Sequence, residues 1–151
     1  MAFDAGLNVD PSSWDLSQSD RSRRKRLWWA LYMQDKWSAL GLGRPSYIQE
    51  DNCSVPLLDL EDIPMRTATG EPLPQTSGRM FVAMGALTQI LSTILSTFYT
   101  LRAARTMPSL PTSELGVWGD YFQLRLSSFH GEHVLPLLTA TESLLDPTGI
   151  N

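Results

Sequence analysis

The sequence of 151 residues lacks the features that mark several common protein classes. It has one cysteine, Cys53, so no disulfide can form within the chain, and a reducing compartment is its natural environment. The N-terminus shows no basic start followed by a long apolar run, so it does not read as a signal peptide. The net charge is −4, which gives no sign of general binding to nucleic acid.

Residues suited to catalysis or metal binding are also sparse. His130 and His133 lie three apart in HGEHV, but the intervening glycine weakens a helix there and no third ligand is in sight. Cys53 has no suitably spaced histidine or second cysteine to activate it as a nucleophile. Gly41 and Gly43 follow a helix-forming stretch and not a strand, so they do not form a dinucleotide-binding fingerprint. We therefore expect no enzyme, and no metal or cofactor in this chain.

The sequence does contain one strongly patterned stretch, residues 21–45, which reads RSRRKRLWWALYMQDKWSALGLGRP. No proline or glycine interrupts it until its last five residues, where Gly43 and Pro45 provide a stop signal. The stretch predicts a helix over residues 20–40. The C-terminal half of this helix is apolar almost all round, which is typical of a helix inside a bundle.

Two further helices are predicted. Apolar residues recur at spacings of three and four over residues 78–106. This segment is almost free of charge, so a membrane span is the alternative, but its serines and threonines favour a bundle helix. A third helix is predicted over residues 113–129, and prolines delimit a last short segment, residues 137–145. The expected core residues are Trp28, Trp29, Leu31, Tyr32, Trp37, Phe81, Leu87, Leu91 and Ile94.

These patterns predict an all-α protein: an irregular helical bundle that forms a fragment of a larger helical domain. Residues 46–78 connect the first two helices and are rich in proline, acid and small polar residues, so strands are not expected there.

The basic run at residues 21–26 lies at the N-terminal end of its helix, where the helix dipole disfavours positive charge. Acidic residues of the same chain are the expected partners, whereas a nuclear-import signal and a contact with nucleic acid are the functional alternatives. The acids in question are Glu50, Asp51, Asp59, Glu61 and Asp62.

Asp35 and Arg44 form a second candidate charge pair. Asp35 lies in the most apolar part of the helix, where an unpartnered carboxylate is costly to bury. Arg44 follows the glycine stop and could reach back with two N–H donors. We expect an ion pair between Arg44 and Asp35, or between Arg44 and an acid of the Glu50–Asp62 loop. A ligand contact by Arg44 is the alternative.

The central stretch resembles the fungal-specific transcription factor domain, the regulatory middle homology region of fungal binuclear zinc-cluster transcription factors. The resemblance covers residues 5–62, and more loosely the chain to Arg105. The strings QDKWS and LGRPS are most similar to members that activate nitrogen-source catabolism. The residues that match the family pattern are Arg23, Arg24, Arg26, Leu27, Trp28, Trp29, Asp35, Gly43, Arg44 and Pro45.

The resemblance implies a nuclear regulatory region that controls transcription by RNA polymerase II, with residues 1–106 in the regulatory domain and 107–151 as a C-terminal helical segment. The residues it marks as regulatory or structural are Arg24, Arg26, Trp28, Trp29, Asp35, Arg44 and Pro45. It implies zinc only in a six-cysteine DNA-binding module, which a chain with one cysteine cannot contain.

On this interpretation the chain is a fragment or truncated product that reaches DNA only through that missing module. A co-regulator or a small-molecule effector is the implied partner, the parent protein could form a homodimer, and no membrane is involved. The alternative is a structural helical module for protein interaction that has no role in transcription.

Overall fold

The computed structural model describes residues 2–64, 66–67 and 69–145, and within them it contains helices, turns and one isolated bridge between Arg66 and Pro72. The predicted all-α class and helical bundle are confirmed. The helices are α1 (Gln18–Leu42), α2 (Gln75–Phe98), α3 (Leu101–Thr106), α4 (Thr112–Phe129) and α5 (Leu135–Leu145).

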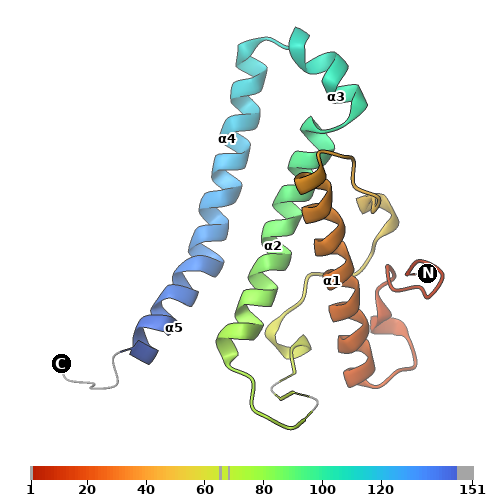
Figure 1. Cartoon of the computed structure of the whole chain (residues 1–151), viewed down its shortest axis with the longest axis vertical. Helices are drawn as coiled ribbons and strands as arrows, with labels where there is room; N and C mark the ends of the chain where they lie inside the picture. The colour runs from red at the N-terminus through yellow and green to blue at the C-terminus, as the bar shows by residue number, and fades with distance from the viewer. Residues whose placement is uncertain (1, 65, 68, 146–151) are drawn as a thin grey trace.

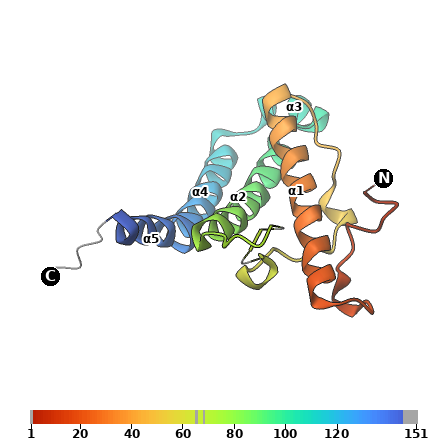
Figure 2. The same cartoon turned by 60° about the horizontal axis from the view of Figure 1, so that its bottom comes forward.

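Helix α2 is the middle element of the bundle, with α1 on one side and the α4–α5 arm on the other (Figures 1 and 2). Helices α1 and α2 run in the same direction, and α4 returns in the opposite one. By length and composition α2 could cross a membrane. Its polar residues Thr88 and Ser92 are buried against neighbouring elements, which is the arrangement of a bundle helix.

Helix α1 begins and ends at residues suited to those positions. The backbone N–H of Asp20 donates to Ser17 Oγ at 3.1 Å, which caps the first turn. Gly43 has a φ of 61°, and the N–H of Arg44 then donates to the carbonyl of Ala39 at 3.0 Å. This left-handed glycine ends the helix, because a side chain there would be strained.

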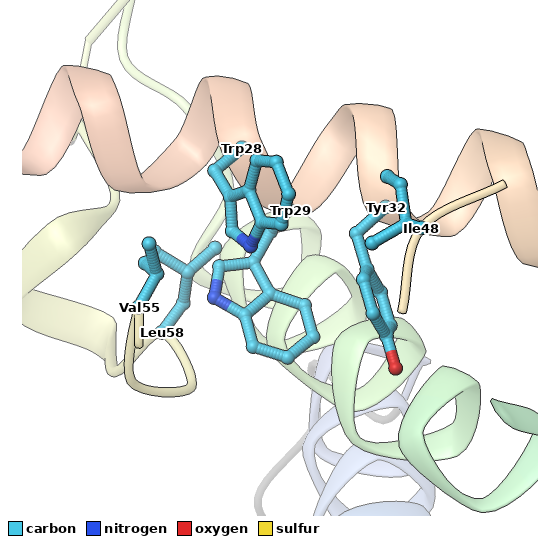
Figure 3. Close-up of a cluster of buried hydrophobic side chains, with 6 residues drawn as sticks. All are labelled: Trp28, Trp29, Tyr32, Ile48, Val55 and Leu58. Carbon is cyan, nitrogen blue, oxygen red and sulfur yellow. The ribbon is translucent and has the colours of Figure 1, made fainter. Parts of the chain in front are cut away.

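The main core lies where α1 meets the connection to α2 (Figure 3). Gly85 of α2 allows the close approach, since a Cβ at that position would lie 3.1 Å from Leu57 and 3.5 Å from Trp29. A small residue there lets the indole of α1 lie directly on α2. The buried cluster consists of Trp28, Trp29, Tyr32, Ile48, Val55 and Leu58.

The prediction that Leu31 and Trp37 of α1 are core residues is wrong. Leu31 is 40% exposed and Trp37 is 38% exposed, while Phe81, Leu87 and Ile94 of α2 are half-buried. The reason is geometric: α1 has apolar residues on nearly every side, but its neighbours cover only one side of it. An all-round apolar pattern indicates burial without indicating which face is buried.

Two predicted helix boundaries are also wrong. The expected helix over residues 78–106 ends at Phe98, because Thr100 accepts a hydrogen bond from the N–H of Ala103 at 3.0 Å and starts α3. At the other end, α4 continues through a π turn, His130–Val134, into α5. Pro136 does not delimit a separate segment, because the widened turn before it makes room for the proline ring.

Candidate functional site

Asp62 is the buried acceptor for the basic run of α1. Its carboxylate is 2% exposed and accepts hydrogen bonds from Ser22 Oγ at 2.7 Å and from Lys25 Nζ at 3.1 Å. Arg26 Nη1 donates to the backbone carbonyl of Asp62. Burial lowers the pKa of Arg26, while the Asp62 carboxylate acts in the opposite direction. The expected partnership between the basic run and the acidic loop is thus confirmed at this one acid.

The turn that presents Asp62 is built by another acid of the same loop. Asp59 Oδ1 accepts hydrogen bonds from the N–H groups of Glu61 at 2.9 Å and Asp62 at 3.1 Å, which caps the short helical turn Leu60–Asp62. Among the residues that the structure describes, Asp59 forms no salt bridge, although its sequence position made it a candidate.

Arg24 holds the N-terminal segment against α1. Its Nη2 donates to the backbone carbonyl of Ala5 at 2.6 Å, and its guanidinium lies 4.5 Å from the centre of the Trp14 ring. Arg21 Nη2 donates to the carbonyl of Trp14 at 2.9 Å. Together with Arg26, these arginines contact the backbone of their own chain, and Arg23 alone in the run is exposed.

The paired tryptophans point in different directions from α1. Trp28 is 1% exposed and meets the ring of Phe3 edge-on, with the ring centres 5.8 Å apart. Trp29 packs edge-on against Tyr32, and its Nε1 donates to the carbonyl of Pro56 at 2.8 Å. One tryptophan thus covers the N-terminal segment, and the other anchors the connection to α2 (Figure 3).

Glu50 joins α1 to α2 through a polar contact that the sequence analysis missed. Its Oε1 accepts hydrogen bonds from the hydroxyls of Tyr32 and of Ser92, the latter at 2.5 Å. Burial raises the pKa of Tyr32, and the bond to the Glu50 carboxylate raises it further. Lys36 Nζ lies 3.8 Å from the same oxygen. Tyr32 and Lys36 lie four residues apart, on the same side of α1. The nearly all-round apolar pattern of this half of the helix gave no sign of a polar contact there.

Lys36 is a buried cation, 2% exposed, on the most apolar part of α1. Its Nζ donates to Ser46 Oγ at 3.0 Å and to the backbone carbonyl of Ile48. The ammonium also lies 5.1 Å from the centre of the Tyr32 ring. These bonds offset the cost of burying the charge, so Lys36 fastens residues 46–48 to α1.

Asp35 fastens the same segment through the backbone. Its two carboxylate oxygens accept hydrogen bonds from the N–H groups of Tyr47 at 3.0 Å and of Ile48 at 2.9 Å. Arg44 instead donates from Nη1 to the hydroxyl of Tyr47 at 2.9 Å and stacks 4.8 Å from that ring. Pro45 lies between them and is exposed.

The predicted ion pair of Arg44 is therefore wrong. Within the described part of the chain, Arg44 makes no salt bridge with Asp35 or with an acid of the Glu50–Asp62 loop. The physical reason is that two backbone N–H groups already satisfy the Asp35 carboxylate. Their positions are fixed by the turn, whereas a long arginine side chain would lose conformational freedom on pairing.

These contacts hold neighbouring segments of the chain against α1. Among residues 2–64, 66–67 and 69–145, the structure shows no group of three or more His, Cys, Asp or Glu residues placed to hold a metal ion. Cys53 donates to the carbonyl of Gln49 at 3.2 Å, and burial raises the pKa of its thiol to about 11. A neutral thiol is a poor nucleophile.

Comparison with known proteins places the chain in a family. The sequence model of the fungal specific transcription factor domain matches residues 1–111, which include α1, α2, α3 and the hydrogen bonds described in this subsection. No solved structure matches the chain.

Several curated proteins are similar to parts of the chain. An uncharacterized transcriptional regulatory protein of Schizosaccharomyces pombe is 31% identical over 65% of this chain and 14% of its own length. The transcriptional activator protein DAL81 of Saccharomyces cerevisiae is 39% identical over 46% of the chain and 7% of its own length. The Zn(2)-C6 fungal-type transcription factor FTF1a of Fusarium oxysporum f. sp. lycopersici is 38% identical over 34% and 5%, respectively.

The chain thus spans a small fraction of the length of the curated relatives it matches. The family and these relatives are transcription factors and regulators rather than enzymes, so the expectation of a non-enzymatic chain is confirmed. With the family model matching residues 1–111 of 151, the chain belongs to the fungal specific transcription factor domain family.

Proposed function

We propose that this chain is the regulatory, or middle homology, region of a fungal zinc-cluster transcription factor that controls transcription by RNA polymerase II in the nucleus. The observation that carries the proposal is the family match over residues 1–111. Support comes from the names of the relatives, which include a transcriptional activator and a Zn(2)-C6 transcription factor. Further support comes from residues that resemble the family pattern, such as Arg24, Trp29 and Asp35, because their side chains connect α1 to its flanking segments.

Binding to DNA, on this proposal, is the task of a zinc-cluster module elsewhere in the parent protein. The one cysteine of this chain cannot form such a cluster, and zinc belongs to that module. Four of the five basic residues at positions 21–26 already contact the chain itself, which argues against a DNA contact by this helix. The parent protein could act as a homodimer, with a co-regulator or small-molecule effector as partner and no membrane involved.

We further propose that the controlled genes serve nutrient use, with nitrogen catabolism as the first candidate. The strings QDKWS and LGRPS support this, because they resemble nitrogen-catabolism activators. In the structure these strings supply Asp35, Lys36 and Arg44, the side chains that hold residues 46–48. We assign residues 1–106 to the regulatory domain and residues 107–151 to a C-terminal helical segment.

A three-part fusion tests the regulatory role. Residues 1–151 are placed between a heterologous DNA-binding domain and a constitutive activation domain in a fungal reporter strain. The proposal predicts lower reporter output than from a length-matched inert helical spacer, and Trp29→Ala should restore the output, because it removes a core residue. Abundance and nuclear amount of the fusions are measured by immunoblot. Output equal to the spacer at equal nuclear abundance would favour a structural interaction module with no transcriptional role.

A further inference from the structure

A groove runs along the contact between α2 and the α4–α5 arm, next to the loop at residues 57–60. Its central hollow has a volume of about 440 Å³ and lies between the loop at residues 57–60, α2 and α5. A hollow of about 570 Å³ continues it past Arg79 and Pro136, and another of about 260 Å³ continues it past Leu57 and Glu132. The central hollow shares Arg79 and Pro136 with the second hollow, and Leu57 and Glu132 with the third, so the three form one groove, here called the α2–α5 groove.

The walls of the central hollow are mainly apolar, which suits the body of an organic molecule. Its volume falls within the range of roughly 300–1,000 Å³ that is usual for small-molecule sites. The hollow is open on one side, so a ligand could enter without unfolding the arm. The apolar lining residues are Leu57, Leu58, Leu60, Val82, Pro136 and Leu137.

The groove is lined by two carboxylates, Asp59 and Glu132, and by two guanidinium groups, Arg79 and Arg125. Asp59 is already occupied as the cap of the turn at residues 60–62, and Glu132 accepts a hydrogen bond from Ser128 at 2.7 Å. Arg79 is half-buried and lines both larger hollows, and within the described residues its guanidinium has no hydrogen bond or ion pair. A guanidinium in an apolar setting binds a carboxylate well, because its N–H groups match the two oxygens.

The backbone around the groove adds two features that agree with an anionic ligand. The first turn of α2, at Gln75 and Thr76, lines the second hollow and has no side-chain cap, so its N–H groups contribute partial positive charge. The π turn His130–Val134 places Glu132 and His133 on the groove wall. Such turns are rare in proteins overall, but those that occur often lie at functional sites. The extra residue in the turn changes which side chains face the neighbouring helix.

We propose that the α2–α5 groove binds an amphipathic organic acid, with its apolar body against Leu57, Val82 and Pro136 and its carboxylate on Arg79. As a statement about regulation this rests on the proposed function, since the acid would be the small-molecule effector. It would bridge the family region and the helical arm that follows residue 111, so that binding changes how firmly the arm packs on α2.

Isothermal titration calorimetry on the full chain, residues 1–151, tests the inference with three probes of equal chain length: decanoate, decan-1-ol and decyltrimethylammonium. The two ionic probes are used below their micelle concentrations, and the alcohol is used below its solubility limit. Decanoate should bind one-to-one and at least about tenfold more tightly than the other two, because only it can pair with Arg79. Similar affinities for all three probes, or no decanoate binding at millimolar concentration, would overturn the inference.

Three variants locate the site. Arg79→Met should weaken decanoate binding about tenfold and leave the binding of decan-1-ol unchanged. Arg102→Met, at an exposed arginine of α3, is the matched control and should bind like the natural chain. Glu132→Gln should bind decanoate more tightly, because it removes a negative charge from the groove wall. Unchanged affinity in both Arg79→Met and Glu132→Gln would refute the site.

Each variant is checked for a native melting curve, and Glu132→Gln keeps the test valid if Arg79→Met does not fold. The binding test is also separable from the transcriptional one. Loss of decanoate binding would remove the ligand proposal and leave the reporter result of the three-part fusion standing. Conversely, a fusion without effect on transcription would leave a measured binding constant intact and remove only its regulatory meaning.

Discussion

The carboxylate of Asp35 and the backbone N–H of Ile48 are joined by a hydrogen bond of 2.9 Å, and the second oxygen of Asp35 takes the N–H of Tyr47. Asp35 lies on α1 and Ile48 belongs to the buried core cluster. The carboxylate therefore determines where the chain comes to lie after the glycine stop, and it brings Ile48 against Tyr32 (Figure 3).

Asp35→Ala is expected to destabilise the protein by about 2–3 kcal/mol, because it leaves two backbone donors without their charged acceptor. Arg44→Met should cost less than about 1 kcal/mol, since it removes only an exposed contact with Tyr47. Urea unfolding measures both values, with Asp15→Ala at an exposed position as control. Equal losses at Asp35 and Arg44 would instead indicate the direct ion pair that the sequence suggested.

Asp62 gives a second prediction, which concerns its buried carboxylate. Asp62→Ala should cost about 3–5 kcal/mol, because the Lys25 ammonium and the Ser22 hydroxyl lose their common acceptor. The double variant with Lys25→Met should be less destabilised than the sum of the two single variants, since neither charge is then left alone. Chemical denaturation of the four proteins gives the coupling energy. Additive losses would show that Lys25 and Asp62 do not interact in solution.

The tryptophans of α1 should differ in their contributions to stability. Trp29→Ala should cost about 3–5 kcal/mol, because the indole is 3% exposed and its loss leaves a cavity beside Gly85. Trp37→Ala should cost less, since that side chain is 38% exposed and mainly donates to Thr88 Oγ1 at 2.9 Å. Melting temperatures of the two variants test the order. A larger loss at Trp37 than at Trp29 would contradict the burial described here.

Because the thiol of Cys53 is partly buried, we expect the free energy of unfolding to fall in alkaline solution. Its pKa is raised from 9.0 to about 11 in the folded protein, so the unfolded thiol ionises first as the pH rises. The folded state then holds more protons than the unfolded state, and the free energy of unfolding falls between about pH 9 and about pH 11. The stabilisation is fully present below about pH 9. Cys53→Ser should show a smaller fall over that interval, and an identical pH profile would refute the assignment.

How much of this fold was predictable depends on the kind of signal. The ends of α1 follow from local chemistry, because a left-handed glycine and a proline leave few alternatives after Leu42. The break at Thr100 was missed, since a threonine inside an apolar periodic stretch is equally compatible with a helix interior. The continuous α4–α5 arm was missed for the opposite reason: Pro136 usually ends a helix, and the π turn that accommodates it leaves no sequence signal.

The candidate site also combines features that the sequence predicts with features that depend on how the chain packs. The pairing of Lys25 with Asp62 could be anticipated from charge alone, although not which of five acids would be buried. The partners of Asp35 could not, because backbone N–H groups are present at every non-proline residue and only the path of the chain selects two of them. The contacts of Glu50 with Lys36 and Ser92 were missed, because they depend on the packing of α1 beside α2.

The central claim is that polar side chains of α1, Asp35 among them, hold the neighbouring segments of the chain against that helix. Amide hydrogen exchange at Tyr47 and Ile48 tests it most directly, in the natural chain and in Asp35→Ala, under conditions where both are folded. The account predicts that the two amides are protected in the natural chain and exchange much faster in the variant, while the amide of Arg44, bonded to Ala39, keeps its protection. Unchanged protection of both amides in Asp35→Ala would contradict it.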